Sequence, residues 1–158
     1  MHSTRLDIPS PVREAAIRIL QARLSDALDL EAQMKQAHWN VRGPAFFQLH
    51  QLFDSLHDTA EGYVDLLAER ITTLGGVADG RVQTTAAATS LDAYPLDAKG
   101  GEAHLRASAA ALGRFGQALR ANIDEAAELP DADTADVLTE VSRGVDQQLW
   151  FVEAHFED

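Results

Sequence analysis

Residues 35–44, KQAHWNVRGP, separate two segments that both have helical periodicity. Before them, residues 12–39 contain no proline or glycine, and apolar side chains recur every three or four positions. Proline disfavours helical conformation in the residue that precedes it, so the Gly43-Pro44 step ends this helix. We therefore predict a helical hairpin whose second helix covers residues 46–74 and ends at the Gly75-Gly76 pair.

The remaining sequence predicts two more helices after a long connection. Residues 77–100 are rich in threonine, alanine and aspartate and contain the Tyr94-Pro95 step, so we expect a crossover with one short helical turn. Helical segments follow near residues 101–128 and 134–156, separated by Pro130. Two helices, a long crossover and two further helices are typical of a four-helix bundle, and we predict an all-α fold.

Composition limits the class of protein. We expect a single domain over residues 1–158, with residues 1–10 as a short tail, and a length of 158 residues with 46% hydrophobic content is enough for a core. The absence of cysteine excludes disulfides, zinc knuckles and thiol nucleophiles. The net charge of −12 repels nucleic-acid phosphates and suits cationic partners. Because no apolar stretch fits a membrane span or a signal peptide, we expect a cytoplasmic protein without a membrane partner.

The second helical segment carries an unusual polar face beside its apolar face. Its members are His50, Asp54, His57, Asp58, Glu61, Asp65 and Glu69. Most charged faces are simply solvated, but such faces usually mix signs because like charges four residues apart destabilise a helix. This face has five carboxylates and neither lysine nor arginine, and Arg70 is the only lysine or arginine in the whole segment. The pattern therefore indicates a cation against this face.

Spacing divides the potential metal ligands into two sets. His50 and Asp54 are four residues apart, and the hairpin turn brings His38 beside them, although a lone histidine is more often a hydrogen-bonded core residue. Asp65 and Glu69 form a second pair, which begins about 16 Å further along the helix at 1.5 Å per residue. Metal–ligand distances are only about 2 Å, so the two sets can meet only if a second copy of this helix runs antiparallel to the first. Imidazole with carboxylate suits iron, zinc fits the same ligand types, and calcium or magnesium fits poorly.

These segments resemble the Dps family, the DNA-binding proteins from starved cells, or mini-ferritins. The resemblance is carried by residues 35–44, by Phe47-xx-His50-xxx-Asp54, by Asp65-xxx-Glu69-Arg70, by residues 91–97 and by residues 133–153. It covers the chain from about residue 10 to its end. It implies a ferritin-like four-helix bundle, with a short extra helix in the crossover between helices 2 and 3, that assembles as a hollow dodecamer.

The resemblance also implies iron storage, protection from oxidative stress and ferroxidase activity. Iron is then the cofactor and substrate: Fe(II) binds between two-fold related subunits and is oxidised to Fe(III), preferentially by hydrogen peroxide, and the ferric mineral is stored inside the shell. The implied catalytic and metal-binding residues are His38, His50 and Asp54 of one subunit with Asp65 and Glu69 of its mate.

Three further expectations come from this resemblance. Trp39, beside His38, has either a packing role or a redox-protective role. The acidic stretch 124–136 resembles the region that lines the pores of the family, with Asp131 and Asp136 as pore candidates, although an ordinary acidic loop explains it equally well. Many members bind DNA through a lysine-rich tail, whereas residues 1–10 hold one basic side chain, Arg5, so we expect weak or absent DNA binding.

Two other functions compete with this prediction. A di-iron site inside one bundle requires Glu-x-x-His on two helices, and the last helix offers only Glu153-Ala-His155, while His104 stands near the start of the third helix. A structural shell or adhesion protein could bind cations on the same acidic face without catalysis. It would oxidise iron no faster than buffer does.

Overall fold

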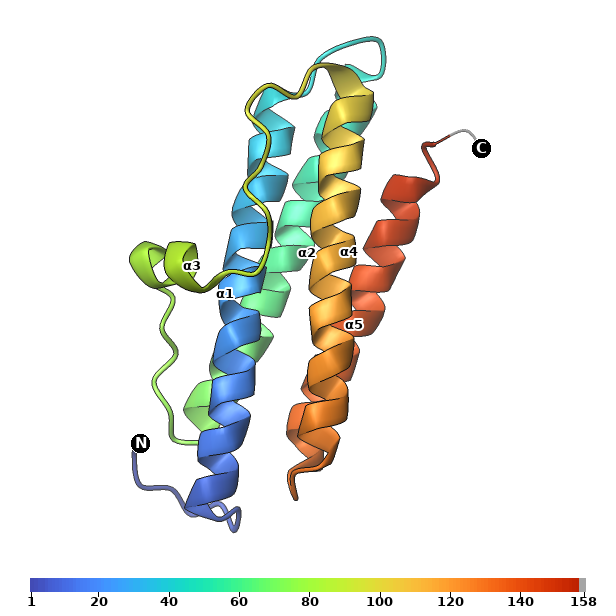
Figure 1. The fold of residues 1–158 in the computed structure, drawn as a ribbon. Coiled ribbons are helices and arrows are strands. Elements are labelled where there is room, and N and C mark those ends of the chain that lie inside the picture. Colours follow the sequence, from blue (N-terminus) through green and yellow to red (C-terminus); the bar gives the residue numbers. More distant parts are fainter. Residues whose placement is uncertain (157–158) are drawn as a thin grey trace.

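Four long helices form the bundle, and the computed structural model describes residues 1–156 of the chain. They are α1 (Ser10–Asn40), α2 (Phe46–Thr73), α4 (Gly100–Ala127) and α5 (Ala132–Glu153). Figure 1 shows α1 with α2 as one antiparallel hairpin and α4 with α5 as another, packed side by side. The short helix α3 (Val82–Ala88) lies in the crossover, outside α1. The predicted all-α bundle, including the short helix of the crossover, is confirmed.

The α1–α2 hairpin ends as its sequence predicts. The N–H of Val41 donates to the carbonyl of Ala37 at 3.0 Å, which closes α1 just before the Gly43-Pro44 step. At the other end of the hairpin, Gly75 has a φ of +85°, a conformation that glycine adopts without strain. The next N–H, of Gly76, donates to the carbonyl of Ile71 at 2.9 Å and so satisfies an orphan acceptor at the end of α2.

The core lies between the two hairpins. Its largest members, Phe53 on α2 and Phe115 on α4, are fully buried. The other fully buried large side chains are Leu20, Leu24, Leu30, Met34, Leu56, Leu67, Ile71, Leu74, Leu112 and Leu119. Burial of an apolar side chain of this size stabilises a fold by about 1.5–3 kcal/mol. The apolar faces that the periodicity predicts are therefore the faces that hold the bundle together.

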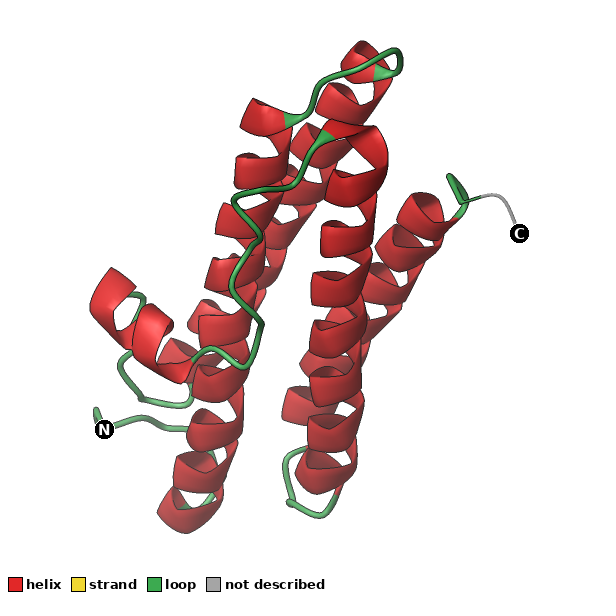
Figure 2. Ribbon diagram, turned by 45° about the horizontal axis from the view of Figure 1, so that its top comes forward, coloured by secondary structure: helices red, strands yellow, loops and turns green. Residues whose placement is uncertain are grey.

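The crossover is fixed to α1 by polar side chains. Asp26 of α1 is fully buried, accepts hydrogen bonds from the N–H of Ser90 at 2.6 Å and its hydroxyl at 3.0 Å, and pairs with Arg23 at 2.9 Å. The amide of Gln33 donates to the carbonyl of Asp92 at 2.9 Å. Figure 2 shows the connection after α3 continuing along the bundle to the end where α4 begins. These bonds therefore let α4 start at the same end of the bundle as the α1–α2 turn.

Within residues 1–156, no helix combines the length and the apolar character that crossing a membrane requires.

Candidate metal centre

His38 and His50 face each other across the α1–α2 hairpin. Their rings are stacked, with centroids 3.7 Å apart and an angle of 22° between the ring planes. Nδ1 of His38 donates to the carbonyl of His50 at 2.8 Å, and Nδ1 of His50 donates to the carbonyl of His38 at 2.8 Å. Since a carbonyl only accepts, each Nδ1 carries a hydrogen, and each Nε2 is left as the nitrogen that can bind a metal. This bond from the outer nitrogen to a carbonyl is the usual support of a metal-binding histidine.

Asp54 lies beside this pair and is already held by a cation. Its Oδ1 is 3.5 Å from Nδ1 of His38 and 2.5 Å from Nζ of Lys35, which comes from α1. The hydrogen bond from Lys35 lowers the pKa of Asp54 and outweighs the opposing effect of desolvation. The carboxylate is therefore ionised and available as a ligand. Lys35 also means that the acidic face of α2 has a cation against it at this point, from a neighbouring helix rather than from a bound ion.

Asp65 and Glu69 lie on the same helix but apart from the other three residues. Both are exposed. Because α2 is continuous from Phe46 to Thr73, the 11 residues between Asp54 and Asp65 correspond to about 16 Å along its axis. Among residues 1–156, no group of three or more His, Asp or Glu side chains is arranged to hold a metal ion. One copy of the chain thus carries two incomplete sets of candidate ligands.

An acidic groove lies beside Asp65 on the α1–α2 surface. It has a volume of about 600 Å³ and is lined by Glu31, Asp58, Glu61, Gly62, Val64 and Asp65. His57, at the edge of this region, donates from Nδ1 to the carbonyl of Glu31 at 3.2 Å. The groove gives Asp65 a strongly anionic surrounding, which attracts cations.

Large aromatic side chains surround the hairpin turn without being buried. Trp39 is 67% exposed and Phe47 is 61% exposed. Phe46 is 44% exposed, and its ring centroid is 5.1 Å from that of His50. A group of exposed aromatic side chains is typical of a surface that contacts another protein. Trp39 therefore contributes little to the packing of a single chain, which removes intrachain packing as its role.

The two pore candidates have different surroundings. Asp136 is exposed on α5, as a pore residue requires. Asp131 is buried and paired with Arg70 at 2.5 Å, and it accepts a hydrogen bond from the hydroxyl of Thr134 at 2.7 Å. The carboxylate of Asp131 is therefore bonded within its own chain, which makes Asp136 the better pore candidate of the two.

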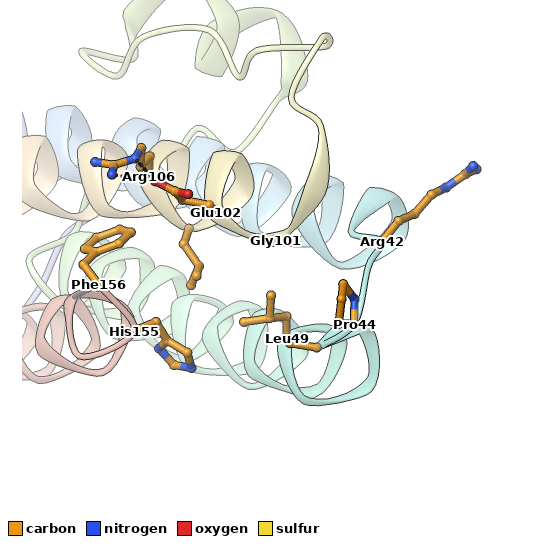
Figure 3. Close-up of a pocket in the computed structure, with 10 residues that line it drawn as sticks. Arg42, Pro44, Leu49, Gly101, Glu102, Arg106, His155 and Phe156 are labelled. Atoms are coloured by element: carbon orange, nitrogen blue, oxygen red, sulfur yellow. Dashed lines mark hydrogen bonds and ion pairs between the residues drawn. The ribbon is translucent and has the colours of Figure 1, made fainter.

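A second region, at the end of the bundle that carries the α1–α2 turn, holds a cavity of about 490 Å³ (Figure 3). Its residues come from the α1–α2 turn, from the starts of α2 and α4 and from the chain after α5. Figure 3 shows Arg106 beside Glu102, while Arg42 points away from the cavity. Arg106 donates to Glu102 at 2.6 Å and lies over the ring of Phe156, 5.0 Å from its centroid. The main charged groups of the cavity thus pair with each other, and it is a weaker candidate than the histidine pair.

The arrangement also bears on the di-iron alternative. His104 is buried and its Nδ1 is 2.6 Å from the hydroxyl of Tyr94, so its ring is bonded to the crossover. His155 is exposed and its Nδ1 donates to the carbonyl of Phe151 at 2.9 Å. Neither belongs to a group of metal ligands in the described part of the chain. The structure therefore does not place a di-iron site inside one bundle.

One residue of this region, Lys35, was not predicted from the sequence. Lys35 stands three residues before His38, so both side chains lie on the same face of α1. This spacing could have identified Lys35 as a neighbour of Asp54.

Comparisons with known proteins agree with the fold. The model of the ferritin-like domain family matches residues 17–158. The chain is 39% identical to a "DNA protection during starvation protein" of Agrobacterium fabrum over 157 residues, which are 99% of this chain and 97% of the relative. It is also 30% identical over 139 residues to the "Fine tangled pili major subunit" of Haemophilus ducreyi, covering 88% of this chain and 73% of the relative.

Solved structures give the same result. The structure of Mycobacterium smegmatis Dps superposes with a TM-score of 0.93 at 29% identity, covering 99% of this chain and 95% of that one. The structure of Dps from Microbacterium arborescens "in the high iron form" has a TM-score of 0.85 at 39% identity, covering 91% of this chain and 93% of that one. The family model, a close relative over the full length and the superposed structures lead to one assignment. The chain belongs to the Dps family of the ferritin-like superfamily.

Proposed function

We propose that this protein stores iron and protects against oxidative stress as a ferroxidase with sites between two-fold related subunits of a hollow dodecamer. Iron handling and protection are the general role of the family. The relative from Agrobacterium fabrum is named for DNA protection, and the Dps from Microbacterium arborescens has been solved in a high iron form.

The observation that carries this proposal is the reciprocal bonding of His38 and His50. Both Nδ1 atoms donate to carbonyls at 2.8 Å, so the Nε2 atom of each of these two neighbouring histidines is left for a metal. Asp54, whose Oδ1 is 3.5 Å from Nδ1 of His38 and whose pKa is lowered, is the proposed oxygen ligand from the same chain. Two imidazoles with carboxylates fit Fe(II), which is the substrate here rather than a resident cofactor.

The remaining ligands come from a second copy. Asp65 and Glu69 are too far along α2 to join the histidines of their own chain, and an antiparallel second copy of α2 supplies them. The exposed aromatic residues next to the histidines, Trp39 and Phe46, offer this copy an apolar surface. A two-fold arrangement produces two identical sites per pair of subunits.

The chemistry balances with peroxide as the oxidant. Two Fe(II) ions give one electron each, the O–O bond of hydrogen peroxide breaks, and two protons complete two water molecules, leaving two Fe(III) ions. Carboxylate oxygens favour Fe(III) over Fe(II), and the histidine nitrogens hold Fe(II) before oxidation. A two-electron transfer releases no hydroxyl radical, which gives the protective effect.

Stopped-flow oxidation tests this proposal. Purified oligomer is loaded with Fe(II) without oxygen and mixed with peroxide, and the wild type is compared with Asp54→Ala and Glu69→Ala. We expect both variants to lose peroxide-driven oxidation. Glu140→Ala, which removes an exposed carboxylate of α5, is the matched control and retains the wild-type rate.

Mixed oligomers test the sharing of the site. In a pair that combines Asp54→Ala with Glu69→Ala, one site loses both residues and the other is intact. Random co-assembly at equal amounts therefore recovers about a quarter of the wild-type sites. No recovery, with both parents folded and assembled, would contradict a site shared between two subunits.

A non-catalytic shell protein is the second candidate, and two observations favour it. Lys35 satisfies Asp54 without a metal, and one relative is a pilus subunit by name. This candidate predicts equal oxidation rates in wild type, variants and buffer, so the same measurement decides between the two.

We also propose that DNA binding is weak or absent. The chain contains 13 basic and 25 acidic residues, and only Lys35 and Lys99 are lysines. Binding to DNA depends on cations that replace condensed counterions, and few are present here.

A further inference from the structure

Arg70 is the one strongly basic residue of α2 and directly follows the proposed ligand Glu69. A positive charge at this place opposes the binding of a cation by Asp65 and Glu69, since charges a few ångströms apart interact appreciably near a protein surface. The side chain of Arg70 is nevertheless only 10% exposed, so it is turned into the protein.

A buried carboxylate holds Arg70 in this position. Nη2 of Arg70 donates to Oδ1 of Asp131 at 2.5 Å, and Nε donates to the hydroxyl of Thr134 at 3.1 Å. Thr134 in turn donates to Oδ2 of Asp131 at 2.7 Å, so both carboxylate oxygens are engaged. The side chain of Asp131 is 1% exposed. Asp133 is on the solvent side of the same guanidinium, 3.7 Å from Nη1, and its side chain is 82% exposed.

We propose that Asp131 is a positioning residue that neutralises Arg70 and keeps it away from Asp65 and Glu69, so that this pair stays free to bind a cation. The inference rests on the proposed function, because it concerns the second half of the same site. It assigns to the turn between α4 and α5 a role in cation affinity at the neighbouring surface of α2. It also explains why Asp131 is buried whereas the neighbouring acids Glu128 and Asp133 are exposed.

A simple structural clamp makes a different prediction. If Arg70 and Asp131 only tie α2 to α5, removal of either residue loosens the end of α2 and weakens cation binding. If Asp131 acts as a counter-ion, the two substitutions affect binding in opposite directions. Removing Arg70 takes away a positive charge that repels the bound cation. Removing the negative charge of Asp131 leaves the positive charge of Arg70 without its neutralising partner.

The test uses zinc ions as the probe, because zinc binds the same nitrogen and oxygen ligands without redox chemistry. Zinc affinity of the full-length oligomer is measured by calorimetry, together with the unfolding temperature. We expect Asp131→Asn to weaken zinc binding by roughly threefold to tenfold and Arg70→Gln to strengthen it by roughly twofold to threefold, consistent with partly screened unit charges. Both variants have a lower unfolding temperature, since each leaves a buried polar group without its partner.

Two further variants separate the effects. Arg70→Gln with Asp131→Asn, which removes both charges, returns the zinc affinity to within about twofold of the wild type, as a cancelled pair of charges requires. Asp133→Asn removes the same charge from the exposed side of Arg70 and has a smaller effect than Asp131→Asn, because solvent screens it. An Arg70→Gln variant that binds zinc more weakly than the wild type overturns the proposal.

Failure of the site itself gives a different result. If Glu69→Ala leaves zinc binding unchanged, the proposed metal site is wrong and this inference falls with it. If Glu69→Ala weakens zinc binding while Arg70→Gln and Asp131→Asn both weaken it too, the site stands and the counter-ion role alone is rejected.

Discussion

The ring of Tyr63 on α2 packs directly against the backbone of Gly144 on α5. A β-carbon at position 144 would lie 3.0 Å from Cζ of Tyr63 and 3.1 Å from Cε1, closer than side chains tolerate. The hydroxyl of Tyr63 is buried and has no hydrogen-bond partner among residues 1–156, and burial raises the pKa of this group to about 12. The close approach of α2 and α5 thus depends on the absence of a side chain at Gly144.

We expect Gly144→Ala to destabilise the fold by about 1–3 kcal/mol, because the extra carbon forces the ring or the helix to move. Gly113 is the matched control, since a β-carbon there meets nothing within 4 Å in the described part of the chain. Gly113→Ala should stabilise α4 by about 0.5–1 kcal/mol. Denaturant unfolding of both variants measures this, and equal effects at the two positions would contradict the packing argument.

Lys35 competes with any cation for Asp54, and its removal should strengthen metal binding. The pair is partly exposed, so we expect Lys35→Met to increase zinc affinity by about twofold to fivefold, the range that an exposed ion pair allows. Lys99→Met removes the other lysine of the chain, which lies in the crossover, and is the control for net charge. Calorimetric titration with zinc, at low and at high salt, measures the affinity of both variants. A Lys35→Met protein that binds zinc no better than Lys99→Met would show that Lys35 and the metal do not compete.

The free energy of unfolding should decrease when the pH is lowered, partly because of His104. Burial lowers the pKa of His104, against a smaller opposing effect of the Asn40 backbone. The folded pKa therefore lies below the unfolded value of about 6.5, and the unfolded chain binds more protons in this window. The contribution of His104 to stability is thus complete above about pH 6.5 and is lost as the pH falls through the folded pKa.

Unfolding temperatures at about pH 7.5 and about pH 5 test this direction. We expect His104→Gln to lose less stability on acidification than the wild type. His155→Gln, which removes an exposed histidine, is the control. Tyr94→Phe removes the hydroxyl at 2.6 Å from Nδ1 and separates the loss of that bond from the effect of the charge. An identical loss of stability in wild type and His104→Gln would assign the pH dependence to other groups.

Plasmid DNA should not be retarded by this protein at about 150 mM salt, because the net charge of −12 opposes contact with phosphates. A version of the chain that carries an added lysine-rich N-terminal segment provides the positive control in the same gel. Retardation of the plasmid by the unmodified protein at this salt would require a local basic surface strong enough to overcome the overall charge.

Local signals predicted the helices well. The uninterrupted residues 12–39, the Gly43-Pro44 step and the Gly75-Gly76 pair mark boundaries by backbone preference alone, and the structure has them within a few residues. The neighbourhood of His38 and His50 could also be predicted, since a short turn forces the ends of two helices together. The helix boundaries and the histidine pair could be predicted because they depend on residues that are close in sequence.

Pairs that are distant in sequence could not be foreseen. Arg70 and Asp131 are 61 residues apart, and nothing in the acidic stretch 124–136 distinguishes the one carboxylate that is buried. Asp26 is a similar case, because an aspartate in the middle of a long helix is usually exposed, whereas here it anchors Ser90 of the crossover. The partner of a buried charge is set by how whole hairpins pack, and a single sequence holds no local signal for it.

The bond between Nδ1 of His50 and the carbonyl of His38 closes one of the last free acceptors of α1, so this proposed iron ligand is also a helix cap. Both histidines, as proposed ligands, therefore also hold the α1–α2 hairpin together through their Nδ1 atoms. The proposed carboxylate ligands Asp54, Asp65 and Glu69 cap no helix end in the described residues. A descendant of this protein that gave up iron would be expected to lose its carboxylates first and keep both histidines. The retention of a histidine pair in a relative is for that reason poor grounds for inferring activity, and the carboxylates are the better markers.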